Sequence, residues 1–326
     1  MRRARIVGTG AYLPEEILTN HDLEAYLDTS DEWIRKRTGI EQRHRAADGE
    51  ATSDMALEAS KQALENAGVA PEELDAVLCC TLTPDQLFPA SGNLLQGKLG
   101  AVNAASCDIN AACSGFLYGL ATATGFIEMG LHKTVLLVGA DKSTSFITWR
   151  HRDTDILFAD GAGAVVLRAE EGDRGIISLY LGSDGANHGI LTLPMGGSKH
   201  PLSPENINDD PYKITMDGRE VYKRAVVKFC ESIDIALNST GLALEDIALF
   251  VPHQANARIT EAVCQRLDFP RERVASNIHK VGNTIAASIP LALHEANEAG
   301  RIQEGDYVLL ASFGAGLTWG SSIIRW

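Results

Sequence analysis

The chain has 326 residues, of which 45% are hydrophobic and 22% charged, and its formal net charge is −14 at pH 7. A chain of this length can bury a large core and form more than one domain-sized unit. The negative charge argues against nucleic-acid binding, because phosphate groups require a basic surface. No apolar run approaches the length that spans a membrane, so we expect neither a nucleic-acid nor a membrane partner.

The cysteines and the start of the chain indicate a reducing compartment. The six cysteines lack the paired spacing of a metal site, and the nine histidines form no ligand cluster. The first residues, MRRARIVGTGAYLP, lack the pattern of a secretory segment and contain a strand-like run. We therefore predict free thiols, a cytoplasmic location and no metal. The cysteines stand at positions 79, 80, 107, 113, 230 and 264.

Strand-like and helical patterns alternate in chain order. Apolar residues at helical spacing recur at 53–68, 222–241 and 288–300, and each of these segments ends in glycine, which is typical of a helix C-terminus. The alternation predicts an α/β fold in which helices pack on largely buried sheets. The strand-like runs are ARIVGTG at 4–10, DAVLCCT at 75–81, KTVLLVGAD at 133–141, GAGAVVLRA at 161–169, IALFVPH at 247–253, DYVLLASF at 306–313 and SSIIRW at 321–326.

Two segments of the chain repeat at one offset. ALENAGVAPEELDAVL begins at Ala63 and ALNSTGLALEDIALFV at Ala236, while VLLVG begins at Val135 and VLLAS at Val308. The offset is the same in both pairs, since 236 − 63 and 308 − 135 both equal 173. Glycine-capped helices followed by apolar strands are common, but an equal offset favours duplication. We predict one half at residues 1–172 and a second at residues 173–326, with a ligand site where they meet.

One stretch raises a question about a thiol. In DINAACSGFLYGL at 108–120, Cys113 has small neighbours and precedes an apolar segment of helical spacing. A nucleophile at the start of a helix needs such room for a substrate. A buried cysteine that packs as a small hydrophobe is the alternative. The stretch alone leaves the two interpretations about equal.

Two polar residues of the second half lie where predicted elements end. His253 follows the apolar run IALFVP, and Asn283 lies in a glycine-containing turn before an apolar helix. Catalytic side chains are often carried at such places by a rigid scaffold. For each residue considered singly, a structural role is at least as good an explanation as a catalytic one. His253 could make a local hydrogen bond, and Asn283 could favour the backbone geometry of the turn.

Considered together, these residues match a family. The chain resembles the β-ketoacyl-acyl-carrier-protein synthase III enzymes of the thiolase-like superfamily, nearly from end to end. The resemblance implies two pseudo-symmetric βαβαβ halves forming a five-layered α/β/α/β/α core, and a homodimer. The matching motifs are TSDEWIRKRTGI at 29–40, NAACSGF at 110–116, FADGAGAVVL at 158–167, PHQANARI at 252–259, VGNTIAASIP at 281–290 and SFGAGLTWG at 312–320.

The resemblance implies a condensing reaction that starts fatty acid biosynthesis. Cys113 matches the nucleophile that takes an acyl group from coenzyme A, and the backbone N–H groups of Cys113 and Gly316 would hold the oxyanion. We expect the thiol to ionise near neutral pH, helped by the helix N-terminus and an imidazole. Malonyl-acyl carrier protein then loses CO2, and His253 and Asn283 donate hydrogen bonds to the developing enolate. No cofactor is implied, because decarboxylation itself generates the carbanion.

The resemblance also implies where the substrates bind. The acidic acyl carrier protein requires a local basic patch on an acidic enzyme. Phe88 matches a residue that reaches across the dimer toward the partner's acyl pocket, although packing within the subunit is the simpler expectation. The residues implied to contact coenzyme A are Trp33, Arg37, Thr38, Arg152, Gly218 and Asn256. The residues implied to receive the carrier are Lys223, Gln254, Ala255, Asn256, Ala257 and Arg258.

Three alternatives remain at this point. A relative on the same fold could load a polyketide or signal-molecule starter or only shuttle acyl groups, but such relatives often alter the histidine or the asparagine, and both are present here. A cysteine hydrolase using Cys113 and His253 would release free acid from acyl-coenzyme A. A non-catalytic acyl-binding protein would not be acylated at all. The acyl-chain preference depends on the shape of a pocket.

Overall fold

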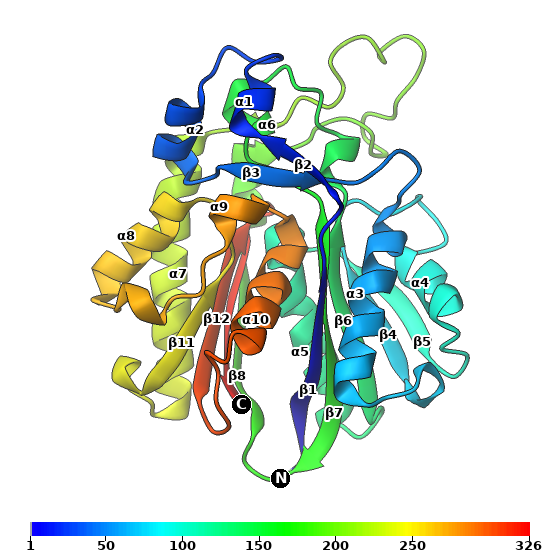
Figure 1. Ribbon diagram of the computed structural model, residues 1–326, viewed down its shortest axis with the longest axis vertical. Coiled ribbons are helices and arrows are strands. Elements are labelled where there is room, and N and C mark those ends of the chain that lie inside the picture. Colours follow the sequence, from blue (N-terminus) through cyan, green and yellow to red (C-terminus); the bar gives the residue numbers. More distant parts are fainter. Residues whose placement is uncertain (1) are drawn as a thin grey trace.

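A computed structural model describes residues 2–326. Two sheets form its frame, and each lies between helices (Figure 1). The first sheet has the strand order β1-β7-β6-β4-β5 and the second has the order β11-β12-β13-β8. The strands of the first sheet are β1 (Arg2–Tyr12), β7 (Gly161–Glu171), β6 (Thr134–Asp141), β4 (Ala76–Cys80) and β5 (Ala105–Ile109). Those of the second are β11 (Ile247–Pro252), β12 (Tyr307–Gly314), β13 (Thr318–Arg325) and β8 (Gly175–Ser183).

The helices form three layers around the sheets. In Figure 1, α3 and α4 cover the outer face of the first sheet, α5 and α10 lie between the sheets, and α7 and α8 cover the outer face of the second. This is the five-layered thiolase-like arrangement, so the predicted fold class is confirmed. The six helices are α3 (Thr52–Ala67), α4 (Ser91–Leu99), α5 (Gly115–Glu128), α10 (Ser288–Glu298), α7 (Gly218–Thr240) and α8 (Ala257–Leu267).

The two sheets repeat one plan at the offset found in the sequence. β6 spans residues 134–141 and β12 spans 307–314, while β1 begins at residue 2 and β8 at residue 175. The strand directions also agree. In the first sheet β6 pairs antiparallel with β7 and parallel with β4, and in the second sheet β12 pairs antiparallel with β13 and parallel with β11. In place of a strand equivalent to β5, the second sheet has an isolated parallel bridge between Phe250 and Val274. The boundary near residue 172 stays a prediction; it falls between β7 and β8.

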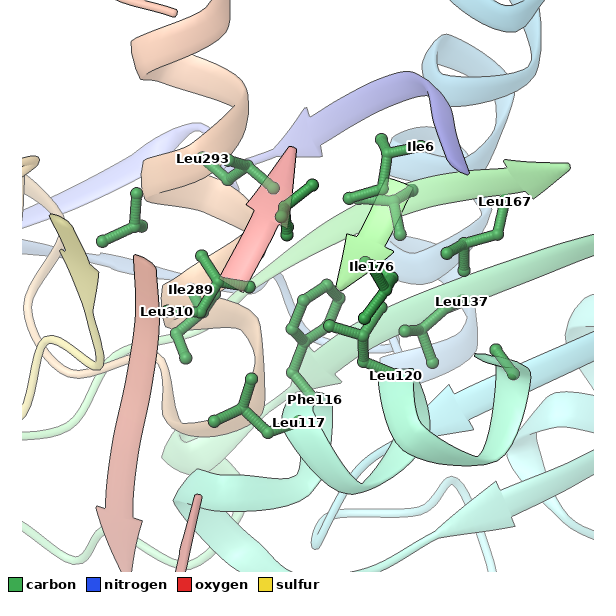
Figure 2. Close-up of a cluster of buried hydrophobic side chains, with 14 of the residues drawn as sticks. Ile6, Phe116, Leu117, Leu120, Leu137, Leu167, Ile176, Ile289, Leu293 and Leu310 are labelled. Carbon is green, nitrogen blue, oxygen red and sulfur yellow. The ribbon is translucent and has the colours of Figure 1, made fainter. Parts of the chain in front are cut away.

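The largest core cluster draws on both halves. On α5 the buried residues Phe116, Leu117 and Leu120 recur at helical spacing and meet Ile289 and Leu293 of α10 (Figure 2). The same cluster includes residues of β6 from the first sheet and of β12 from the second. Burial of a large apolar side chain stabilises by about 1.5–3 kcal/mol, so the central layer holds the sheets in one fixed relation.

Shorter elements close the end of the molecule where the parallel strands β4, β6, β11 and β12 finish. A hairpin of β2 (Glu16–Thr19) and β3 (Gln42–Arg45) lies there with the helix α2 (Asp31–Thr38), as Figure 1 shows. No described helix is both long and apolar enough to cross a membrane. Other short elements include α1 (Asn20–Leu23), α6 (Arg152–Asp155), α9 (Ile278–Val281), β9 (Leu191–Thr192), β10 (Thr215–Met216) and the 3-10 turns η2 (Ala112–Ser114) and η7 (Ile285–Ala287).

Candidate active site

Two turns of the same design carry the thiol and the amide. The Asn110 side chain accepts a hydrogen bond from the N–H of Ala112 (3.2 Å), whose φ is 47°. The Asn283 side chain likewise accepts one from the N–H of Ile285 (2.9 Å), whose φ is 54°. Left-handed backbone at a residue other than glycine costs on the order of 1–3 kcal/mol, so the surrounding structure must hold both turns. The first turn presents Cys113 and the second presents Asn283.

The Cys113 thiol sits where the two halves meet. Cys113 lies just before α5 and is 8% exposed. A Cβ added at Gly314, the last residue of β12, would come within 2.7 Å of the Cys113 Cβ and 2.9 Å of its backbone nitrogen. The Ser114 hydroxyl donates to the carbonyl of Thr318 (3.1 Å), and the Thr318 hydroxyl donates to the carbonyl of Ala111 (2.9 Å). The strand-to-helix turn therefore packs directly on the second sheet.

Burial keeps the thiol protonated in this structure. Desolvation and the nearby charge of Asp141 raise the pKa of Cys113 to about 12. Hydrogen bonds from the backbone N–H groups of Cys113 and Ala315 act against this rise. The expectation that the thiol ionises near neutral pH is therefore wrong for the buried thiol seen here. Desolvation is the largest cause of the raised pKa of Cys113.

His253 follows β11 and is neutral. Only 2% of the residue is exposed, and burial lowers the pKa of the imidazole to about 3. Its Nδ1 lies 2.5 Å from the Ser288 Oγ, which also accepts the backbone N–H of Gln254 at 3.3 Å. Its Nε2 is buried and has no hydrogen-bond partner in the described part of the chain. The ring is thus fixed on one side and has one nitrogen left for a ligand.

Asn283 is fixed through its backbone and its side-chain oxygen. Its N–H donates to the carbonyl of Leu157 and its carbonyl accepts the N–H of Ala159, both at 2.9 Å. The side-chain Oδ1 accepts the N–H of Ile285, as described above. Among residues 2–326, the side-chain Nδ2 finds no acceptor. This amide nitrogen has no protein partner, and neither has the His253 Nε2, which is a donor in the tautomer that carries the proton there.

One cavity of about 650 Å³ brings Cys113, His253 and Asn283 together. Three residues that are up to 170 positions apart in the chain (283 − 113) therefore line one space. The apolar side chains near the thiol, among them Phe146, Phe158 and Ile285, form a small core cluster with Cys113. The other predicted site residues that line this cavity are Trp33, Arg37, Thr38, Arg152, Gly218, Ala255, Asn256 and Arg258.

The outer part of the cavity carries aromatic and cationic groups. The guanidinium carbon of Arg152 lies 4.6 Å from the centre of the Trp33 ring, and that of Arg37 lies 5.4 Å from it. Arg258 lies 5.8 Å from the ring of Tyr222. Cations on aromatic faces are stabilised, and the arginine forks keep donors for anions. The cavity therefore runs from a cationic, aromatic entrance to the buried thiol.

The structure buries two of the residues predicted to contact a substrate or the carrier. Gln254 is 1% exposed and donates through Nε2 to the carbonyls of Pro252 (2.8 Å) and Ala275 (3.2 Å), so its side chain is not on a docking surface. Thr38 is also buried, and its hydroxyl donates to the carbonyl of Ile34 at 2.7 Å, so its proton is not available to a phosphate.

The neighbouring predicted residues differ in exposure. The Ala257 side chain faces Gly39, because a Cβ at Gly39 would lie 2.5 Å from the Ala257 Cβ. Lys223 and Arg258 are exposed. Asn256 caps α8 through the N–H of Arg258 (2.9 Å) and donates to the carbonyl of Arg37 (3.1 Å), so it ties α8 to α2.

Three residues at the site escaped the sequence reasoning. The backbone N–H that reaches the thiol from the second half belongs to Ala315, not to the expected Gly316. Gly314 gives Cys113 its room, and Ser288 holds His253. The glycines of the run SFGAG could have indicated a close backbone contact. The sequence does not show, however, that the residue in contact with Gly314 is Cys113. Residues 2–326 contain no group of three or more His, Cys, Asp or Glu placed to hold a metal.

Phe88 is 84% exposed and Leu87 is 91% exposed, in the loop between β4 and α4. Packing of Phe88 within its own subunit, which was the simpler expectation, is therefore wrong. Two adjacent exposed apolar side chains are unusual for a surface loop and are typical of a contact with another molecule. A reach across a dimer stays a prediction.

Comparison with known proteins identifies the class of fold and then the family. Residues 107–185 match the family model "3-Oxoacyl-[acyl-carrier-protein (ACP)] synthase III", and residues 237–326 match the model of its C-terminal part. The β-ketoacyl-[acyl-carrier-protein] synthase III of Caldanaerobacter subterraneus subsp. tengcongensis is 50% identical over 324 residues, which cover 99% of this chain and 98% of that protein.

The crystal structure of the Aquifex aeolicus 3-oxoacyl-[acyl-carrier-protein] synthase III has a TM-score of 0.92 at 43% identity and covers 99% of this chain and 100% of its own. A priming β-ketosynthase from a polyketide biosynthetic pathway has a TM-score of 0.92 at 34% identity, with 99% and 96% covered. The fold thus defines an acyltransferase of the thiolase-like condensing class. Within that class, the chain belongs to the 3-oxoacyl-[acyl-carrier-protein] synthase III family.

Proposed function

We propose that this enzyme transfers a short acyl group from coenzyme A to Cys113 and condenses it with malonyl-acyl carrier protein, starting fatty acid synthesis. The observation that carries the proposal is the pair of donors without protein partners. His253 Nε2 and Asn283 Nδ2 line the same cavity as the thiol. Two fixed donors beside a nucleophile suit a reaction in which negative charge develops on a carbonyl oxygen.

In the first step the Cys113 sulfur attacks the thioester carbonyl of acyl-coenzyme A. Because the thiol is protonated and His253 is neutral, the thiol proton must leave as the sulfur–carbon bond forms. His253 Nε2 carries the imidazole proton in the second step, so we do not assign it this role. The thiol proton passes through water to the departing coenzyme A sulfur, which leaves as a thiol. The N–H groups of Cys113 and Ala315 are the donors that we assign to the tetrahedral oxyanion.

In the second step the malonyl group loses CO2. The electron pair of the broken carbon–carbon bond becomes an enolate, whose oxygen accepts hydrogen bonds from His253 Nε2 and Asn283 Nδ2. We assign the Ser288 hydroxyl as the donor to His253 Nδ1, which lies 2.5 Å away, because this step requires the imidazole proton on Nε2. The enolate carbon then attacks the acyl carbon on Cys113, and the sulfur leaves with its electron pair. The products are a 3-oxoacyl-carrier protein and CO2.

We assign the entrance of the cavity to coenzyme A. Arg152 and Arg37 lie against Trp33, so a flat base has both an aromatic and a guanidinium surface on which to stack. Arg152 also donates to the carbonyl of Asp28 at 2.7 Å. Gly218 and Asn256 line the same cavity and complete this contact set.

We assign the surface beside the entrance to the carrier protein. Lys223 and Arg258 are exposed there and supply positive charge that an acidic carrier requires on an enzyme of net charge −14. Arg258 is the second residue of α8, and a cation at a helix N-terminus interacts unfavourably with the helix dipole. Helix stability therefore does not explain why an arginine stands at this position.

We further propose a homodimer and a cytoplasmic location. The exposed Leu87 and Phe88 form an apolar tip that a second subunit would cover. Two starter classes remain possible on this fold, since a priming β-ketosynthase of a polyketide pathway is among the similar structures. The 50% identity to a β-ketoacyl-[acyl-carrier-protein] synthase III exceeds the 34% identity to that synthase and supports fatty acid synthesis.

Intact-mass measurement after incubation with acetyl-coenzyme A tests the proposal. We expect one acetyl group on the wild type and none on Cys113→Ala, because Cys113 is the cysteine that lines the cavity within residues 2–326. Addition of malonyl-carrier should then release CO2 and give a 3-oxobutyryl-carrier. Undiminished acetylation of Cys113→Ala would refute the assignment. Rapid release of free acetate without malonyl-carrier would support a thioesterase instead.

A further inference from the structure

Asp141 is a buried carboxylate beside the site to which the reaction assigns no role. It ends β6, is 0% exposed, and has no cation against it in the described part of the chain. Its Oδ1 accepts hydrogen bonds from the Thr81 hydroxyl (3.0 Å), the Thr83 hydroxyl (3.0 Å) and the N–H of Leu82 (2.9 Å). Its Oδ2 accepts the N–H of Ala286 at 3.0 Å. Burial of a charge among neutral donors costs free energy, so its presence needs an explanation.

The internal repeat relates Asp141 to the oxyanion site. Ala286 is the counterpart of Cys113 and Gly314 is the counterpart of Asp141, because 286 − 113 and 314 − 141 both equal the offset of the repeat. In the first turn, Gly314 has no side chain, so the Cys113 N–H is open to an oxyanion. In the second turn, the equivalent N–H of Ala286 is occupied by the Asp141 carboxylate. Asp141 thus places a carboxylate where the other half would receive the transient oxyanion.

This bond lies next to the one that orients the amide. Ile285 donates its N–H to the Asn283 Oδ1 and has a φ of 54°, and Ala286 follows it directly. Such a strained turn persists only when its neighbours hold it. We propose, on the basis of the proposed function, that Asp141 is a positioning residue: by holding the Ala286 N–H it keeps the Ile285 turn in place and so aims the Asn283 Nδ2 at the enolate.

The charge of Asp141 has a second consequence for the thiol. Asp141 contributes to the raised pKa of Cys113, after desolvation. Burial raises the pKa of Asp141 itself to about 6, so its carboxylate is mostly ionised at neutral pH. Removal of the charge should therefore make Cys113 more reactive, while loss of the Ala286 contact makes decarboxylation slower. A carboxylate that only stabilises the fold would not move the two activities in opposite directions.

Asp141→Asn tests this directly. One amide oxygen can replace Oδ1, but the amide NH₂ then faces the N–H of Ala286, and two donors cannot bond. We expect release of CO2 from malonyl-carrier to fall at least about tenfold. Alkylation of Cys113 by iodoacetamide near neutral pH should become several-fold faster, since each unit of pKa changes the thiolate fraction about tenfold.

Asp160→Asn is the matched control. Asp160 is also 0% exposed and is held by neutral donors, among them the N–H groups of Ala46 (2.8 Å) and Thr144 (2.9 Å), but it does not contribute to the raised pKa of Cys113. We expect it to lower the unfolding temperature without accelerating alkylation. Asp141→Ser, in which a short hydroxyl replaces the carboxylate, is the second variant and should change both activities as Asp141→Asn does.

Unchanged decarboxylation in a folded Asp141 variant overturns the proposal, as does a parallel fall of both activities. Failure of both Asp141 variants to fold while Asp160→Asn folds would overturn it in favour of a structural carboxylate. A wild-type enzyme that releases no CO2 from malonyl-carrier refutes the proposed function instead, so the two failures are distinguishable.

Discussion

At the scale of single residues, the two halves use equivalent turns for different tasks. Asn110 and Asn283 each hold a left-handed residue two positions later, and each turn precedes a central helix. The first turn exposes a backbone N–H and a thiol, and the second exposes an amide. Duplication explains how one strained backbone design serves both the proposed nucleophile and the proposed hydrogen-bond donor.

Loss of either partnerless donor should separate the two half-reactions. In His253→Ala or Asn283→Ala we expect malonyl decarboxylation to fall on the order of 10²-fold, the usual effect of removing one oxyanion donor. Acetylation of Cys113 should fall less, because the N–H groups of Cys113 and Ala315 still hold that oxyanion. Measured release of CO2 and intact mass give the two rates. Equal decarboxylation by variant and wild type would contradict the assigned roles.

Gly314→Ala should displace the nucleophile. The new Cβ would lie 2.7 Å from the Cys113 Cβ and 2.9 Å from the Cys113 backbone nitrogen, separations that real Cβ atoms essentially never show. Neither of these two atoms can give way unless the Cys113 backbone shifts. We expect acetylation to fall on the order of 10²-fold and the free energy of unfolding to fall by about 1–3 kcal/mol. Gly125→Ala on α5 is the control, because a Cβ there meets nothing within 4 Å. It should keep full acetylation, and an equal loss in both variants would argue against the close approach.

At the scale of elements, each helix and strand near the site does one positioning task. β11 carries His253 to the cavity, the N-terminal end of α5 carries Cys113, and α10 brings Ser288 against the imidazole. α2 and α8 form the entrance, tied together by the bond from Asn256 to the Arg37 carbonyl. The site is therefore built from element ends that one rigid core holds in register.

Helix α8 offers a test of carrier docking. Arg258 lies at its start on the cavity, and Arg266 lies exposed near its other end, away from the cavity lining. Arg258→Glu should raise the KM for malonyl-carrier about tenfold while it leaves the KM for acetyl-coenzyme A within about twofold, and the effect should shrink with added salt. Arg266→Glu makes the same charge change on the same helix and should have little effect. If the two variants behave alike, only net charge matters and Arg258 is not a docking residue.

At the scale of the whole molecule, burial of titratable groups in the shared core makes the free energy of unfolding depend on pH. Folding lowers the pKa of His253 from 6.5 to about 3. At a pH between these two values, the imidazole is protonated in the unfolded chain and neutral in the folded chain. Stability is therefore lost as the pH falls below about 6.5. Asp141 acts in the opposite sense, because its pKa is raised to about 6 and the folded state then binds a proton first.

The comparison of wild type with His253→Gln isolates the histidine. We expect acidification from about pH 7.5 to about pH 5 to reduce the free energy of unfolding of the wild type by about 2 kcal/mol more than that of the variant. Urea unfolding at both pH values measures the difference. The same acid sensitivity in both proteins would show that the imidazole titrates normally and is not buried.

The sequence by itself determined the alternation of elements and the repeat that relates the two halves, because local periodicity and spacing carry both. Its motifs also singled out residues that line one cavity and whose roles stay proposals: Cys113, His253, Asn283, Trp33, Arg37 and Arg152.

Only the tertiary structure decided which atoms of those residues are free. It placed Ala315 rather than Gly316 at the thiol, buried Gln254, kept the Cys113 thiol protonated and put the Asp141 carboxylate on Ala286. The physical reason is that burial, close approach and hydrogen-bond partners depend on neighbours brought together from both halves. A local pattern contains no record of those neighbours, so desolvation and donor geometry arise only when the two sheets close on the central helices.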